Sequence, residues 1–243
     1  MPDALLTPEG CVAAFSDVVD ELRPGARVLD CAAGIGQLAV GLALRGFDVA
    51  ASDANGAMIE RIRTLAARHG AALEATTCEW ENLTRQGWGE AFDAVFCVGN
   101  SLTHATGQAG RRAALAAMGG VLCEGGLVVV TSRNWERLRD ERPGLLVADR
   151  LAERDGSEGL VVHAWTIPDA WEETHLFEIA VAVIDEAGGV TTRSERLPFW
   201  PFTHRTLEGD LRAAGLAPVT STYAEDVERY VVTARRGRYT GAG

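Results

Sequence analysis

Residues 27–37 read Arg-Val-Leu-Asp-Cys-Ala-Ala-Gly-Ile-Gly-Gln, a short apolar run that ends at Asp30 and breaks into a loop of small residues. A second apolar run, residues 47–52, is followed by Asp53, seventeen positions past Gly36. In a parallel sheet the carboxyl ends of neighbouring strands meet at one edge, where a glycine turn and a carboxylate together hold a ribose. The two stretches therefore predict an α/β protein whose parallel sheet binds a nucleoside.

The chain up to about residue 132 continues this alternation of strands and helices. A helix over residues 8–22 precedes the first strand. Such alternation is typical of a doubly wound parallel sheet with right-handed crossovers. The predicted strands are 26–30, 47–52, 72–77, 92–98 and 127–132, and the predicted helices between them are 36–44, 57–68 and 111–122.

Beyond about residue 140 the pattern changes to antiparallel strands joined by short turns. These strands are predicted over residues 160–167, 174–184 and 190–198. A helix over residues 206–214 and a strand pair, 219–223 and 229–234, close the chain before a tail that we expect to fray. A hairpin at the end of a parallel sheet is unusual for a plain dinucleotide-binding fold.

Composition and charge exclude several functions. The 243 residues are 47% hydrophobic, enough for a sizeable core, and the net charge of -11 argues against a nucleic-acid partner. The five cysteines lack the CxxC spacing of a zinc site, and no His/Asp/Glu cluster has metal-ligand spacing. We find no signal peptide and no apolar run of about 18 residues to span a membrane. We therefore expect a cytoplasmic protein without metal or membrane partner, and homo-oligomer formation stays open.

Four segments resemble the class I S-adenosylmethionine-dependent methyltransferases, namely residues 28–36, Asp53, residues 78–80 and residues 92–97. Within that class, Val-Gly-Asn-Ser-Leu-Thr-His at 98–104 and Ser-Arg-Asn-Trp at 132–135 are similar to segments of the glycine and sarcosine N-methyltransferases. The resemblance implies a Rossmann-like, doubly wound, mostly parallel seven-stranded sheet with an antiparallel last strand. A small antiparallel sheet is inserted after strand five.

The same reading divides the chain into an N-terminal helix or lid (1–25), a cofactor-binding core (26–135 and 200–236) and an inserted module that covers the substrate (136–199). Three departures from the family weaken the case for glycine itself as the substrate. Ala32 stands where the family has its first loop glycine, and no arginine precedes Arg23 to meet the cofactor carboxylate. A tyrosine near the family's amino-acid substrate has no clear counterpart after Arg133.

The predicted cofactor is S-adenosylmethionine, held at the strand ends. Asp30 faces the methionine amino group through the loop or a water, and Asp53 accepts both ribose hydroxyls. Glu79 accepts from the adenine amino group and Trp80 offers an apolar face. The remaining predicted contacts are Ala32, Gly34, Gly36, Ala54, Met58 and the backbone of Val98. The alternatives are a helix-capping acid at Asp30, a solvated turn acid at Asp53 and a loop tryptophan at Trp80.

The predicted acceptor site follows strands four and five. Methyl transfer is an in-line displacement, so it needs an aligned nucleophile more than a strong base. We expect Asn100 to orient an amine, and His104 to contact the cofactor or to act as a base toward a hydroxyl, unless it merely starts a helix. Arg133 is expected to clamp a carboxylate, which the resemblance also implies, unless it pairs with Glu136 or Asp140.

These residues favour methyl transfer to a small molecule, with the amine nitrogen of a carboxylate-bearing metabolite as the acceptor. An O- or C-methyltransferase of a natural product, with His104 or His204 as base, is one alternative. A nicotinamide-dependent oxidoreductase is another, because residues 34–39 also satisfy the GxGxxA pattern. A cofactor-binding scaffold without catalysis is a third. Asp30 disfavours a pyrophosphate beside the loop, since like charges repel.

Overall fold

The start of the sequence motif quoted above forms strand β1 (Arg27–Asp30), an interior strand of the larger sheet. β1 pairs in parallel with β2 (Asp48–Asp53) on one side and with β4 (Phe92–Cys97) on the other. Both faces of a central parallel strand are covered, and the side chains of Val28, Leu29 and Asp30 are buried accordingly. The carboxyl ends of β1, β2 and β4 thus meet at one edge.

The structure is a computed structural model that describes residues 7–147, 152–154, 157–185 and 188–237. Its larger sheet has seven strands in the order β11-β12-β5-β4-β1-β2-β3. The strands not yet introduced are β3 (Glu74–Thr77), β5 (Leu122–Arg133), β11 (Leu216–Ser221) and β12 (Arg229–Arg236). β12 is antiparallel to both β5 and β11, whereas the other pairs are parallel. The predicted fold class is confirmed.

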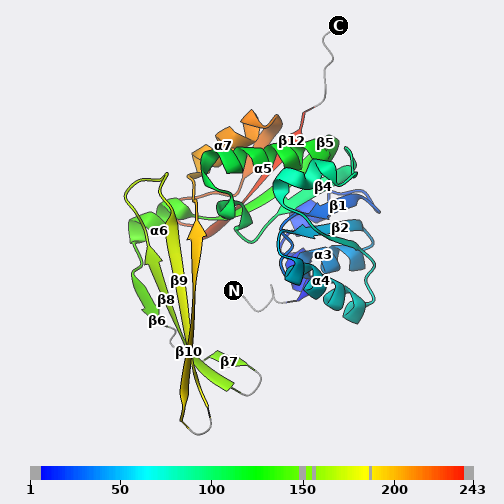
Figure 1. Cartoon of the computed structure of the whole chain (residues 1–243). Helices are drawn as coiled ribbons and strands as arrows, with labels where there is room; N and C mark the ends of the chain where they lie inside the picture. Colours follow the sequence, from blue (N-terminus) through cyan, green and yellow to red (C-terminus); the bar gives the residue numbers. More distant parts are fainter. Residues whose placement is uncertain (1–6, 148–151, 155–156, 186–187, 238–243) are drawn as a thin grey trace.

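Helices cover the two faces of this sheet (Figure 1). One core forms beneath α1 (Pro8–Ala13), α2 (Ser16–Val19), α3 (Gln37–Leu44) and α4 (Gly56–His69). The other forms beneath α5 (Gly107–Val121), α7 (His204–Ala213) and the 3-10 helix η2 (Trp80–Arg85). The short 3-10 helix η3 (Ser101–His104) follows β4 at the ligand-bearing edge. None of the helices in the described residues is long and apolar enough to cross a membrane.

The smaller sheet is antiparallel and projects away from the helical layers (Figure 1). Its strands are β6 (Leu145–Val147), β7 (Ala152–Arg154), β8 (Ser157–Thr166), β9 (His175–Ile184) and β10 (Val190–Phe199). The order is β10-β9-β8-β6, with β7 beside β8. Its base packs on α6 (Trp135–Glu141) through a small aromatic cluster around Trp135 and Phe199. The insertion after strand five is therefore confirmed.

Several predicted boundaries need correction. The helix expected over residues 8–22 is two short helices, because the helical backbone is interrupted between Ala13 and Ser16. Strand five begins at Leu122, five residues earlier than expected, so the preceding helix ends at Val121. Residues 1–6 of the expected lid, 186–187 of a hairpin turn and 238–243 of the tail lie outside the described residues. The division into lid, core and covering module stays a prediction.

Candidate functional site

A pocket of about 630 Å³ lies at the carboxyl ends of β1, β2 and β3 and beside η3. These strand ends are where open α/β sheets bind their ligands. The lining residues are Cys31, Ala32, Gly34, Asp53, Ala54, Cys78, Glu79, Trp80, Glu81, Ser101, His104, Ala105 and Thr106. The two predicted halves of the site, glycine loop and acid, are thus on one wall.

The loop after β1 is hydrogen-bonded to Asp53, the last residue of β2. The Gly34 N–H donates to Asp53 Oδ2 at 2.9 Å, and the Asn55 N–H donates to Asp53 Oδ1, also at 2.9 Å. Each carboxylate oxygen keeps a further acceptor direction, so two hydroxyl donors can still be bound. Gly36 has a φ of +88°, and a Cβ there would lie 2.9 Å from Ile62 Cγ1. Only glycine fits this turn without a shift of α4.

Asp30 lies beneath the loop rather than in the pocket lining. Its side chain is 1% exposed, and its Oδ1 has no hydrogen-bond partner among the described residues. Burial raises the pKa of Asp30 to about 7, and the charge of Asp53 adds to the shift, while the Ala32 N–H opposes it. A cation placed near this carboxyl therefore favours its ionised form.

Trp80 lines the pocket, on the wall where the sequence predicts the adenine ring. Its indole Nε1 donates to the Cys31 carbonyl oxygen at 2.7 Å, which ties η2 to the end of β1. Glu79 is exposed beside it and lines the pocket. The indole face and an acidic acceptor therefore stand at the same wall.

Asn100 has a structural task that the sequence did not reveal. Its Oδ1 accepts from the Arg133 N–H at 3.0 Å and from Trp135 Nε1 at 3.2 Å, and its Nδ2 donates to Thr103 Oγ1 at 3.0 Å. The residue is buried and its backbone is left-handed, with a φ of +69°. Asparagine tolerates that conformation better than most residues. Its carboxamide therefore joins β5, α6 and η3.

His104 lines the pocket, with its ring centroid 4.6 Å from that of Phe199. The surrounding protein lowers the pKa of its imidazole by desolvation, although the Pro198 carbonyl opposes the shift and the residue is exposed at the pocket. A neutral imidazole at neutral pH follows.

Arg133 is half-buried at the end of β5. Its Nη2 lies 3.8 Å from Glu228 Oε1, and its guanidinium carbon is 5.9 Å from the ring centroid of Trp165 on β8. The alternative predicted for Arg133 was an ion pair with a nearby acid such as Glu136 or Asp140. The acid beside it is Glu228, whereas Glu136 accepts from the His204 N–H. Its donors are therefore not saturated by a close carboxylate.

Seven predicted residues line the pocket and six do not. Those that line it are Ala32, Gly34, Asp53, Ala54, Glu79, Trp80 and His104. Those outside the lining are Asp30, Gly36, Met58, Val98, Asn100 and Arg133. The lining residues that sequence reasoning missed are Cys31, Cys78, Glu81, Ser101, Ala105 and Thr106. Five of them directly adjoin a predicted residue in the sequence, and Thr106 lies two positions past His104. The signal that could have found them is their position just after a strand end.

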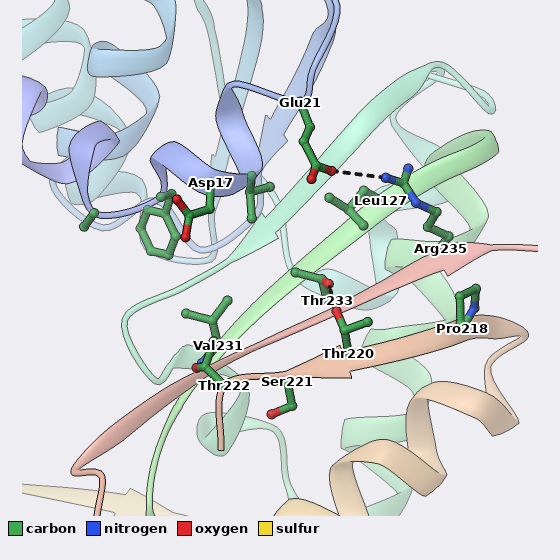
Figure 2. A pocket seen from close by; sticks show the side chains of 13 residues that line it. Asp17, Glu21, Leu127, Pro218, Thr220, Ser221, Thr222, Val231, Thr233 and Arg235 are labelled. Carbon is green, nitrogen blue, oxygen red and sulfur yellow. Dashed lines mark hydrogen bonds and ion pairs between the residues drawn. The ribbon is translucent and has the colours of Figure 1, made fainter. Parts of the chain in front are cut away.

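A second groove, of about 410 Å³, lies away from this pocket. It is lined by residues of the α2 region, β5, β11 and β12 (Figure 2). Glu21 and Arg235 form an ion pair at 3.6 Å across it. None of the predicted site residues lines this groove. The described residues hold no group of three His, Cys, Asp or Glu side chains placed for a metal ion.

Residues 28–126 match the family described as "Methyltransferase domain". The chain is 37% identical to a glycine/sarcosine N-methyltransferase of Aphanothece halophytica over 115 residues, 47% of this chain and 43% of that protein. It is 40% identical to the enzyme of the same name from Parasynechococcus marenigrum, over 47% of this chain and 40% of that protein. The chain thus spans less than half the length of these curated relatives.

Solved structures share the fold over most of the chain. The amino pentose methyltransferase CalS10 from Micromonospora echinaspora, solved with S-adenosylmethionine bound, has a TM-score of 0.76 at 22% identity and covers 95% of this chain and 92% of its own. The sugar N-methyltransferase KedS8 from Streptoalloteichus has a TM-score of 0.74 at 24% identity, with 93% and 86% covered. Residues 28–126 are therefore similar to a methyltransferase domain, and these neighbours, one of them solved with S-adenosylmethionine bound, share the fold of the chain.

The residues at the pocket fit this cofactor. Asp53 keeps acceptor capacity for a ribose, Trp80 offers an aromatic wall, and the unpartnered Oδ1 of buried Asp30 suits an ammonium group nearby. The lining contains no arginine or lysine for a pyrophosphate. A sulfonium nucleoside therefore suits this donor and acceptor set better than a dinucleotide.

Proposed function

We propose that this protein transfers a methyl group from S-adenosylmethionine to the nitrogen of a small amine that also carries an acidic group. The observation that carries the proposal is the Gly34–Asp53 contact on the wall of a pocket at the strand ends. It lies within the residues that match the methyltransferase domain. The curated relatives that are named for glycine and sarcosine support nitrogen as the acceptor atom.

We assign the cofactor contacts to four side chains. Asp53 accepts from the ribose, Glu79 accepts from the adenine amino group, and the indole of Trp80 packs on the ring. Asp30 supports the methionine ammonium from beneath the loop. When bound, the cofactor supplies a methyl group already activated on a sulfonium sulfur.

The acceptor needs alignment and a free electron pair on its nitrogen. We place its acidic group on Arg133, whose guanidinium has no carboxylate closer than Glu228, at 3.8 Å, among the described residues. Asn100 acts as a positioning residue here, because its carbonyl oxygen already accepts from the Arg133 N–H and from Trp135. It fixes the backbone of Arg133 rather than contacting the amine.

The inserted sheet covers the acceptor in this proposal. Trp165 of β8 stands beside Arg133, and the Phe199 ring at the end of β10 contacts His104. Aromatic side chains over the reacting atoms exclude water, which strengthens the charge interactions inside. This assigns residues 136–199 the role of substrate cover and specificity.

The O- or C-methyltransferase alternative is favoured by one observation, the position of His104 in the pocket lining, where desolvation lowers the pKa of its imidazole. A neutral imidazole can remove a proton from a phenol or alcohol, whereas a neutral amine needs no base before attack. His104→Ala should therefore leave an amine-directed activity within about threefold and reduce a hydroxyl-directed one by at least about 100-fold. Initial rates of S-adenosylhomocysteine release distinguish the two.

Cofactor choice is tested by calorimetric titration with S-adenosylmethionine, S-adenosylhomocysteine and NAD. We expect micromolar binding of the first two and no binding of NAD. The opposite pattern would establish the oxidoreductase alternative. A screen of amino acids, amino sugars and small amines, which measures the release of S-adenosylhomocysteine, then identifies the acceptor. Product binding without turnover on any acceptor would instead indicate a non-catalytic scaffold.

A further inference from the structure

Two arginines stand directly opposite one another at the ligand-bearing end of the sheet. Arg133 ends β5 and Arg229 begins β12, and the two residues are register partners in the antiparallel ladder. Side chains of directly opposed residues leave the same face of a sheet, with Cβ atoms about 5 Å apart. β5 and β12 lie side by side in Figure 1. Both guanidinium groups therefore occupy one region.

The surroundings do not neutralise this pair. Arg229 is exposed and has no side-chain hydrogen bond or ion pair among the described residues. The acid beside Arg133, Glu228, lies 3.8 Å away, and its side chain is 71% exposed. That distance is beyond a hydrogen bond, and an exposed pair of this kind contributes little. Among the described residues, neither guanidinium has a carboxylate within hydrogen-bond distance.

Like charges directly opposite one another destabilise a sheet. The pKa of Arg133 is lowered first by burial and then by the charge of Arg229, while Glu228 and Glu141 oppose the shift. In a chain with a net charge of -11, two basic residues held face to face without close acids are unusual. An anion between the guanidinium groups would relieve the repulsion.

The location links this pair to the acceptor rather than to the cofactor. The Arg133 N–H binds Asn100, which directly precedes η3, and Trp165 flanks the Arg133 guanidinium. Neither arginine lines the pocket that holds the glycine loop and Asp53. A single carboxylate saturates one guanidinium in a bidentate pair, so two guanidinium groups suit a group with two charges.

We propose that Arg133 and Arg229 together bind a doubly charged oxyanion of the acceptor, either a phosphoryl group or a pair of carboxylates. This inference rests on the proposed function, since it specifies the acceptor of that same site. It narrows the substrate from an acidic amine to an amine with a dianionic end. Arg229 lies outside the residues that match the methyltransferase domain, so it distinguishes acceptors rather than the shared cofactor.

The test measures anion binding by calorimetry on protein saturated with S-adenosylhomocysteine, at low ionic strength and mildly alkaline pH. The probes are inorganic phosphate, malonate and acetate. We expect phosphate or malonate to bind at least about tenfold more tightly than acetate. The tighter of the two identifies the dianion as phosphoryl or dicarboxylate. Equal affinity for all three probes would overturn the inference.

Variants complete the test. Arg229→Gln should reduce dianion affinity to that of acetate and leave S-adenosylhomocysteine affinity unchanged. Arg61→Gln is the matched control, because Arg61 is an exposed arginine on α4 without an ion pair in the described structure. Unaltered dianion binding in Arg229→Gln, or an equal loss in Arg61→Gln, would refute the pair. Failure of the wild-type protein to bind S-adenosylhomocysteine would refute the proposed function instead.

A gain-of-binding variant guards against loss by misfolding. Glu228→Gln removes the carboxylate nearest to Arg133, which competes with any bound anion. It should tighten phosphate or malonate binding by about twofold to fivefold, the effect of an exposed ion pair. A weakening of dianion binding in this variant would contradict the inference.

Discussion

The two sheets of this molecule differ in how far their strands are buried. In the seven-stranded sheet, β4 is buried along almost its whole length and both faces carry helices. In the smaller sheet, residues 190–196 of β10 and all of β6 are exposed. Packing fixes the geometry of the first sheet, which suits the cofactor site that we propose there. The second sheet is held by its aromatic base, and we propose that it serves the acceptor.

Truncation of a core side chain should give the largest contrast between the two sheets. Phe96 on β4 is fully buried, so Phe96→Ala should lower the free energy of unfolding by about 3–5 kcal/mol. Leu145 on β6 is 69% exposed, and Leu145→Ala should change it by less than about 0.5 kcal/mol. Urea denaturation measures both. Similar losses for the two variants would break the comparison.

The pH dependence of stability should carry the mark of Asp30, whose pKa is raised to about 7 in the folded protein. The folded state keeps this proton over a range in which the unfolded chain, with a pKa near 3.8, has lost it. The contribution is therefore full below pH 3.8 and lost as the pH rises to about 7. The loss is on the order of 4 kcal/mol. Asp30→Asn should flatten the dependence of the unfolding free energy on pH, and the exposed control Asp226→Asn should leave it unchanged. An unaltered pH dependence in Asp30→Asn would contradict the assignment.

Cofactor binding should depend on the large sheet and acceptor turnover on the small one. Asp53→Ala should raise the dissociation constant of S-adenosylhomocysteine at least about tenfold, a loss of about 1.4 kcal/mol. Trp165→Ala should leave that constant within about twofold and lower kcat/KM for the acceptor. Calorimetry and steady-state rates separate the effects. A cofactor defect in Trp165→Ala would mean that the insert also shapes the nucleoside site.

The smallest effect is expected at the base of the inserted sheet, with the opposite sign to Asp30. His175 is buried, Arg139 Nη1 lies 2.7 Å from its Nε2, and its Nδ1 lies 3.1 Å from the Glu173 carbonyl. Burial lowers the pKa of His175, with the charge of Arg139 adding to the shift. The unfolded chain therefore binds the extra proton, and stability is lost as the pH falls below 6.5. The melting temperature of His175→Gln should not fall in this way at acidic pH. If it does, the loss of stability belongs to another group.

Sequence reasoning went furthest where local chemistry decides the structure. The run ending at Asp30, the glycine turn at Gly36 and the acid at Asp53 each follow from strand ends and backbone φ, and their elements were placed correctly. Seven of the predicted residues therefore reached one pocket.

It failed where distant elements compete for one group. Asn100 was expected to face the amine, but Trp135 and Arg133, which follow it by more than 30 positions, occupy its carbonyl. The break between α1 and α2 and the pairing of Arg133 with Arg229 also depend on tertiary packing. No local pattern encodes such partners, because they come from other elements of the fold.

The carboxamide of Asn100 has a consequence for how the protein melts. One oxygen joins the last residue of β5 to the indole of Trp135, and that indole in turn contacts Trp165 and Phe199 in the projecting sheet. Heat that loosens the projecting sheet must therefore disturb the centre of the larger one. Scanning calorimetry of the wild-type protein should accordingly record a single endotherm, and Asn100→Ala should split it into two.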